Sequence, residues 1–171
     1  MARALASLVR HGYSDPRTVA LYAPAVALAS EAEDPKVLLP EVYGVWAGRH
    51  VAEAVGPALE VAAQMLDDAA RRGNSDLEMM GNRLLPVSLT MGDRFTETRP
   101  CFMRAARLYD PSRHRTHTAN IGIDPIVGTN CYWALAELAL GHPSQHFAVN
   151  SVSPCQLAAG LRKPACLCWV G

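Results

Sequence analysis

Apolar residues recur every three or four positions over several segments of the chain, which is the spacing that places them on one face of an α-helix. The segment 55–72 shows it most clearly, because charged and amide side chains fill the positions between the apolar ones. Its apolar positions are Val55, Leu59, Ala62, Ala63, Leu66, Ala69 and Ala70. Two further sets repeat the spacing: Phe102, Ala105, Ala106 and Tyr109, then Cys131, Leu135 and Leu138. The pattern predicts amphipathic helices that pack through these positions.

Turn-forming residues divide the chain into pieces of helical length. A short polar side chain can accept from the free amides of a first helical turn, and proline is tolerated at the first helical position. The expected N-caps are Ser14 or Asp15, Asp34, Ser75 and Asp124. Helices are expected to open on Pro16, Pro35 and Pro125. Prolines within the apolar runs predict late starts or kinks at Pro24, Pro40, Pro57 and Pro86.

These breaks alternate in kind along the chain. Those near residues 14, 52, 92 and 141 have the character of tight turns inside a helix pair, whereas those near 35, 75 and 110–125 separate one pair from the next. The pairs recur about every 40 residues, which is typical of helical repeat proteins. The sequence therefore predicts an all-α fold, a right-handed α-solenoid of about three to four antiparallel helix hairpins. A single helical bundle is the structural alternative.

Composition and charge agree with a helical protein and exclude several classes. The 171 residues include 27 alanines and only 6% aromatic residues, which favours closely packed helices over a β-sandwich or barrel. Sixteen basic residues balance sixteen acidic ones, so nucleic-acid binding is not expected. No apolar run approaches the roughly 20 residues of a membrane helix, and no secretory signal is recognised near the start. We expect a cytoplasmic protein without a membrane partner.

The stretch from Gly81 to Pro111, with its ending RAARLYDP, resembles a tetratricopeptide-type repeat. The resemblance implies that Ala106, a small residue on the second helix of the hairpin, packs close to the first helix, and that Pro111 ends the unit. The repeat-packing positions that it implies are Leu85, Ala105, Ala106, Tyr109, Pro111, Leu135 and Gly141. The likeness spans about Gly12 to Gln145, so residues 1–145 are expected to form a repeat domain.

The segment from Arg113 to Gln145 looks like the next module of the C-terminal repeat region of bacterial class III adenylate or guanylate cyclases and signalling ATPases. That resemblance implies a regulatory, non-catalytic scaffold that binds a protein, a peptide or the neighbouring domains of a longer protein. The chain holds neither the phosphate-binding loop of an ATPase nor the aspartate pair of a cyclase. We therefore predict that it is not an enzyme and uses no cofactor.

One polar cluster suggests chemistry, because histidine beside a carboxylate suits acid–base catalysis near neutral pH. It comprises Arg113, His114, His117 and Asp124. The competing interpretation is an ordered connection between repeats, in which Asp124 caps the next helix. An enzyme fragment or a pH sensor that uses the segment His114–Asp124 is the alternative function.

The five cysteines exclude a complete set of disulfides, and their spacing matches no structural zinc site. They are Cys101, Cys131, Cys155, Cys166 and Cys168. Residues 146–171 depart from the repeat pattern, since no acidic residue occurs from Leu138 to Gly171. Two explanations stay open: an out-of-frame ending of a truncated gene, or an irregular C-terminus that covers the last hairpin. Exposed ends of the repeat array predict self-association.

Overall fold

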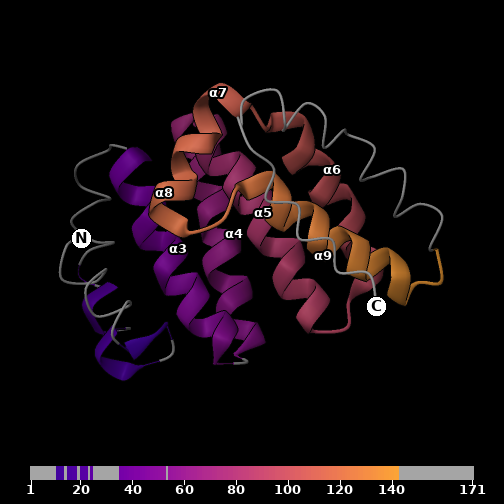
Figure 1. The fold of residues 1–171 in the computed structure, drawn as a ribbon, viewed down its shortest axis with the longest axis horizontal. Coiled ribbons are helices and arrows are strands. Elements are labelled where there is room, and N and C mark those ends of the chain that lie inside the picture. Colours follow the sequence, from indigo (N-terminus) through magenta and orange to yellow (C-terminus); the bar gives the residue numbers. More distant parts are fainter. Residues whose placement is uncertain are drawn as a thin grey trace, which may run out of the picture.

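The computed structural model describes residues 11–13, 15–18, 20–22, 24, 35–52 and 54–142. Within this part of the chain every regular element is helical (Figure 1), which confirms the all-α prediction. The long helices are α3 (Pro35–Val51), α4 (Val55–Arg72), α5 (Ser75–Met91), α6 (Thr98–Leu108) and α9 (Pro125–Ala139). The short elements are η1 (Phe95–Glu97), α7 (Pro111–His114), η2 (Arg115–His117) and α8 (Thr118–Ile121). The predictions for Ser14, Asp34, residues 146–171 and Cys155, Cys166 and Cys168 lie outside the described residues.

The described helix boundaries lie at the predicted breaks, and the predicted cap Asp124 is confirmed. The side chain of Asp124 accepts from the amide of Ile126 at 3.0 Å, and α9 opens on Pro125. The predicted cap Ser75 is wrong, because it is the first residue of α5. Asn74 caps this helix instead, since its backbone is extended and its side chain accepts from the next two free amides.

Two prolines that predict a break or kink lie inside continuous helices. Pro40 lies within α3 and Pro86 within α5, and neither helix ends there. Both residues are buried. Packing of the surrounding helix faces therefore outweighs the loss of one backbone hydrogen bond at each proline.

The buried face of α4 is rotated relative to the prediction. It consists of Ala58, Ala62, Met65 and Ala69. Ala63 and Ala70, which belong to the predicted apolar face, are exposed. Alanine is small and lies in helices on either face, so a pattern that counts it as apolar does not fix the orientation of an alanine-rich helix.

Helix α5 is the centre of the fold and contacts α3, α4, α6 and α9. Its buried residues Leu77, Met80 and Leu84 form a core with apolar side chains of these neighbours, Leu38 and Phe102 among them. Among the described helices, none combines the length and hydropathy that a membrane span requires.

Consecutive long helices run antiparallel. Gly81 of α5 lies against Leu66 of α4, and these two residues are at similar distances along the chain from the turn that joins the helices, as in an antiparallel pair. Arg104, in the second half of α6, binds Glu78 near the start of α5. Tyr109, which follows α6, binds Asp124, which precedes α9. The segment α7–η2–α8 connects α6 to α9; in Figure 1 it runs from α7 at the top down to α8, which contacts α3.

Candidate functional site

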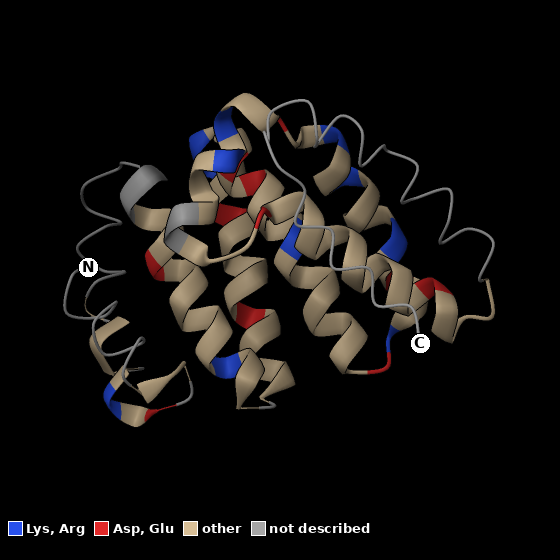
Figure 2. Cartoon of the chain, viewed as in Figure 1, with Lys and Arg blue, Asp and Glu red and all other residues tan. Residues whose placement is uncertain are grey.

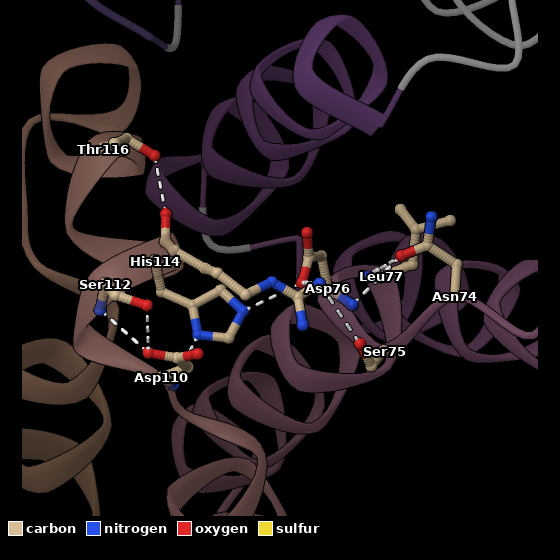
Figure 3. A network of polar contacts seen from close by, with 9 residues as sticks. Asn74, Ser75, Asp76, Leu77, Asp110, Ser112, His114 and Thr116 are labelled. Atoms are coloured by element: carbon tan, nitrogen blue, oxygen red, sulfur yellow. Dashed lines mark hydrogen bonds and ion pairs between the residues drawn. The ribbon is translucent and has the colours of Figure 1, made fainter.

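The structure brings the two predicted histidines together, but the carboxylate beside them is not that of Asp124. His114 and His117 approach Asp76, at the start of α5, so that one ligand-type atom of each residue lies within 4.8 Å of the other two. Arg113 forms an ion pair with Asp76, and Figure 3 shows the ring of His114 directed at the same carboxylate. Asp124 belongs elsewhere, because it caps α9. Asp76 lies 38 positions before His114 in the chain, and no sequence signal connects the two residues.

Both ring nitrogens of His114 are already hydrogen-bonded. Its Nδ1 lies 2.7 Å from the backbone nitrogen of Asp110, and its Nε2 lies 3.0 Å from Oδ1 of Asp76. A backbone N–H can only donate, so Nδ1 accepts and the ring proton is on Nε2. Nε2 then donates to the carboxylate. The side chain is 1% exposed, so these two bonds satisfy a buried imidazole.

The carboxylate of Asp76 connects the α7–η2 segment to the start of α5. It accepts from His114 and also from the guanidinium of Arg113, whose Nη2 lies 3.4 Å from Oγ of Ser75 as well. Figure 2 shows the basic residues of this segment beside acidic residues of α5. A negative charge in the first turn of a helix is also favoured by the helix dipole. The cluster therefore has the contacts of a clamp between two segments.

His117 completes the cluster through a ring contact with His114. It is 6% exposed, and its ring stacks on that of His114 with centroids 5.7 Å apart. Burial lowers the pKa of His117, and the nearby His114 and Arg113 lower it further, whereas Asp76 acts in the opposite direction. The neutral imidazole is therefore favoured in the folded chain.

Asp124 and Tyr109 form a separate contact, which joins the two ends of the segment between α6 and α9. The Tyr109 hydroxyl donates to Oδ2 of Asp124 at 3.0 Å, while Oδ1 of the same carboxylate caps α9. Burial together with this hydrogen bond raises the pKa of Tyr109 to about 12. The interpretation of Asp124 as a helix cap in an ordered connection is confirmed.

The hydrogen bonds of His114 fit neither a metal ligand nor an acid–base catalyst. A metal-bound histidine donates its outer ring N–H to a second-shell acceptor, whereas Nδ1 of His114 faces a donor. A general base needs a ring nitrogen directed at a substrate, but both nitrogens of His114 have protein partners. The geometry supports a structural role.

A cleft of about 320 Å³ lies where the end of α3 and the start of α4 meet the end of α5. It is lined by His50, Val55, Ala58, Ser88 and Met91. The Ser88 hydroxyl accepts from the Trp46 indole and donates to the carbonyl of Leu84. His50 stacks on Trp46, and its pKa is lowered by burial and by the charge of Arg83. The cleft is mainly apolar, and the Ser88 hydroxyl that lines it already has two protein partners.

Sequence reasoning missed a buried cation, Arg83, in the middle of α5. Its side chain is 4% exposed, and its Nε donates to the carbonyl of Pro125 at 3.2 Å. The guanidinium lies 5.4 Å from the ring centroid of Tyr43, within the range of a cation–π contact. These contacts connect α3, α5 and α9.

The exposed face of α9 is entirely apolar. Val127 is 39% exposed, Leu135 48% and Leu138 60%, and Cys131 and Ala139 are exposed as well. The spacing of Cys131, Leu135 and Leu138 predicts a packing face. Within the described residues, however, α9 packs on α5 and α6 through its opposite face, which includes Ile126, Ala134 and Ala136.

The other predicted repeat-packing residues have varied environments. Ala105 is 1% exposed, whereas Ala106 is only half-buried. Leu85 packs against the core, and Tyr109 is half-buried. Pro111 is exposed and begins α7, and Gly141 is exposed after α9 with a left-handed backbone at φ 78°.

Comparison of the chain with models of known protein families, with curated proteins and with solved structures finds no match to any of them. The functional argument therefore rests on the residues of this chain.

Proposed function

We propose that this chain is a non-catalytic protein-binding module whose docking surface is the exposed face of α9. The observation that carries the proposal is the composition of this face. All five exposed residues of α9 are apolar or cysteine, whereas the exposed side of a surface helix is normally polar. A contiguous apolar patch on a folded protein is typical of an interaction site.

The arrangement of the long helices supports a repeat scaffold for this surface. Each consecutive pair, α3 with α4 and α5 with α6, forms an antiparallel hairpin, and α9 packs on α5 and α6 as the first helix of a third hairpin would. Helix α3 also contacts α5, which corresponds to packing of first helices in neighbouring hairpins. We therefore extend the proposal to a tetratricopeptide-like hairpin array, with α7–η2–α8 as an inserted connection.

The resemblance to repeat regions of bacterial cyclases and signalling ATPases suggests the context of such a module. In that context the array recognises a partner protein, or a neighbouring domain, and transmits its binding to a catalytic unit. The saturated hydrogen bonds of His114 favour this scaffold over the enzyme alternative.

Photo-crosslinking in cells tests the docking surface. A photoreactive phenylalanine analogue replaces Leu135 on α9 or, as the control, Glu60 on the exposed side of α4. We expect protein adducts from position 135 and none, or far fewer, from position 60. Equal yields from both positions, or no adduct from position 135, contradict the proposal.

A second function, pH sensing through the segment His114–Asp124, is favoured by one observation: the buried ring of His117 stacks on that of His114, and burial lowers its pKa. Protonation of this ring would place a positive charge beside Arg113 and His114. If the chain is a pH sensor, the adduct yield at position 135 changes between pH 7.5 and pH 5.5, and His117→Gln removes the change. A yield that is independent of pH rules this function out.

A further inference from the structure

Helix α9 is apolar on both sides, although only one side is covered by the described helices. Its single acidic or basic residue, Glu137, is 1% exposed and belongs to the covered side. At 3.6 residues per turn, the exposed residues occupy an arc of about 120°. This arc runs along almost the whole helix, from Val127 to Ala139.

The absence of charge restricts what can cover this arc. A partner that brings a charged side chain onto it would lose hydration without gaining an ion pair, which is unfavourable. The complementary surface is therefore another uncharged apolar helix face. The chain itself offers such a face, and two identical patches can pair about a two-fold axis.

On the basis of the proposed function, we infer that the partner at this surface is a second copy of the chain, with the two α9 helices packed antiparallel. The exposed arc is centred near residue 133, between Cys131 and Leu135. In the antiparallel register, Cys131 lies opposite Leu135 of the second copy, and Val127 lies opposite Ala139 of the second copy. Each copy then covers the apolar arc of the other.

The size of the arc sets the strength of the contact. A helix of 15 residues is about 22 Å long and about 10 Å wide, so the pair buries far less than the roughly 800 Å² per partner of a standard interface. The dimer is therefore weak, and monomer and dimer coexist at concentrations that can be sampled by dilution.

The reactivity of Cys131 tests the occupant of the surface in the full chain. Maleimide modification at each cysteine is followed by peptide mass spectrometry over a series of chain concentrations, with Glu60→Cys on α4 as an exposed reference. We expect the rate at Cys131 to fall as concentration rises, while the rate at the reference stays constant. A fast rate at all concentrations overturns the inference, because no copy then covers the face. A slow rate at all concentrations also overturns it, because another part of the same chain is then the occupant.

Crosslinking between two differently labelled chains tests the register. One chain retains Cys131, and the other carries Cys131→Ser together with Leu135→Cys. Mild oxidation of the mixture is expected to form the 131–135 disulfide between chains in larger amount than a 131–131 disulfide in the wild type. The reverse preference overturns the antiparallel arrangement.

A charge substitution separates this inference from the proposed function. Leu135→Glu is expected to raise the dissociation constant of the dimer by at least about tenfold. The control Val51→Glu replaces another exposed apolar residue, on α3, and leaves the constant unchanged. A chain that stays monomeric by light scattering at all concentrations overturns the dimer. If position 135 then still yields adducts with another protein, the docking surface stands and only its partner is different.

Discussion

Gly128 of α9 lies directly against the guanidinium of Arg83 on α5. A Cβ atom at position 128 would lie 2.5 Å from Nη2 and 3.2 Å from Cζ of the arginine. The same guanidinium donates through Nε to the carbonyl of Pro125 and faces the ring of Tyr43. The missing side chain of Gly128 therefore makes room for a buried cation that holds α9 against α5.

Gly128→Ala is expected to destabilise the chain even though alanine favours a helix. Alanine in place of glycine contributes about 1 kcal/mol to helix stability, but overpacking a core typically costs about 1–3 kcal/mol. The guanidinium must also move away from the carbonyl of Pro125. The free energy of unfolding, from urea denaturation, measures the result. Gly56→Ala in α4 is the control, because no atom lies within 4 Å of its added Cβ, and it is expected to be neutral or stabilising. Equal effects of the two substitutions would show that Arg83 does not fill the space at Gly128.

Arg99→Ala is expected to be more destabilising than Arg94→Ala. Arg99 pairs with Oε1 of Glu137, whose side chain is 2% exposed; Trp133 donates to the same oxygen, and Nδ1 of His142 lies 3.4 Å from Oε2. Removal of Arg99 leaves this buried carboxylate without its main cation, and we expect a loss of about 2 kcal/mol. Arg94 and Glu97 form an exposed pair, so Arg94→Ala should change the free energy of unfolding little. Chemical denaturation of both variants provides the comparison, and similar midpoints would exclude a structural role for the Glu137 pair.

Asp76→Ala tests the clamp between α5 and the α7–η2 segment. The substitution leaves Nε2 of the buried His114 without an acceptor and frees Arg113, so we expect a loss of about 1–3 kcal/mol. Amide hydrogen exchange should increase in the segment Pro111–Ile121 before the rest of the chain. Asp67→Ala on the exposed side of α4 serves as the control and should change neither quantity. If exchange in the segment stays unchanged, the cluster does not act as a clamp.

The stability of the chain should decrease as the pH falls below about 6.5, the pKa of an unperturbed histidine. The pKa of His117 is lowered in the folded chain, so the unfolded chain binds the proton first as the pH falls. Stability is therefore greatest above about pH 6.5 and is lost progressively down to the lowered pKa of the folded state, below which this residue contributes no further change. The groups that face His117 are His114, Asp76 and Arg113.

His117→Gln should flatten the dependence of unfolding free energy on pH in this window. His50 contributes in the same direction, because its pKa is also lowered, so the double substitution with His50→Gln should flatten the curve further. Urea denaturation at a series of pH values measures both slopes. A slope that His117→Gln does not change would exclude this residue as a source of the pH dependence.

Local signals in the sequence predicted most of the helix boundaries. Asp124 followed by Pro125 predicts the start of α9, and the structure begins the helix there with the predicted cap. Such signals act within a few residues, because a cap bonds the amides of its own first turn. The incorrect prediction of Ser75 as a cap is off by one residue, because the adjacent Asn74 competes for the same amides.

The site was less predictable because its partners are distant in the sequence. The histidines and Arg113 were identified, but their carboxylate is Asp76, which reaches them only through the packing of the connection against the start of α5. The sequence did not indicate that Arg83 is buried, because a single arginine in a helix is usually solvated. Only the tertiary structure places it between Tyr43 and Gly128.

The sequence by itself determined that the chain is helical and where most helices begin and end, because these properties depend on short-range hydrogen bonds and side-chain spacing. The tertiary structure decided which apolar face is buried. In α9 the periodic residues Cys131, Leu135 and Leu138 predict packing, yet the described fold buries the opposite side. A helix with apolar residues on both sides has no preferred orientation of its own, so its neighbours α5 and α6 determine which side remains available to a partner.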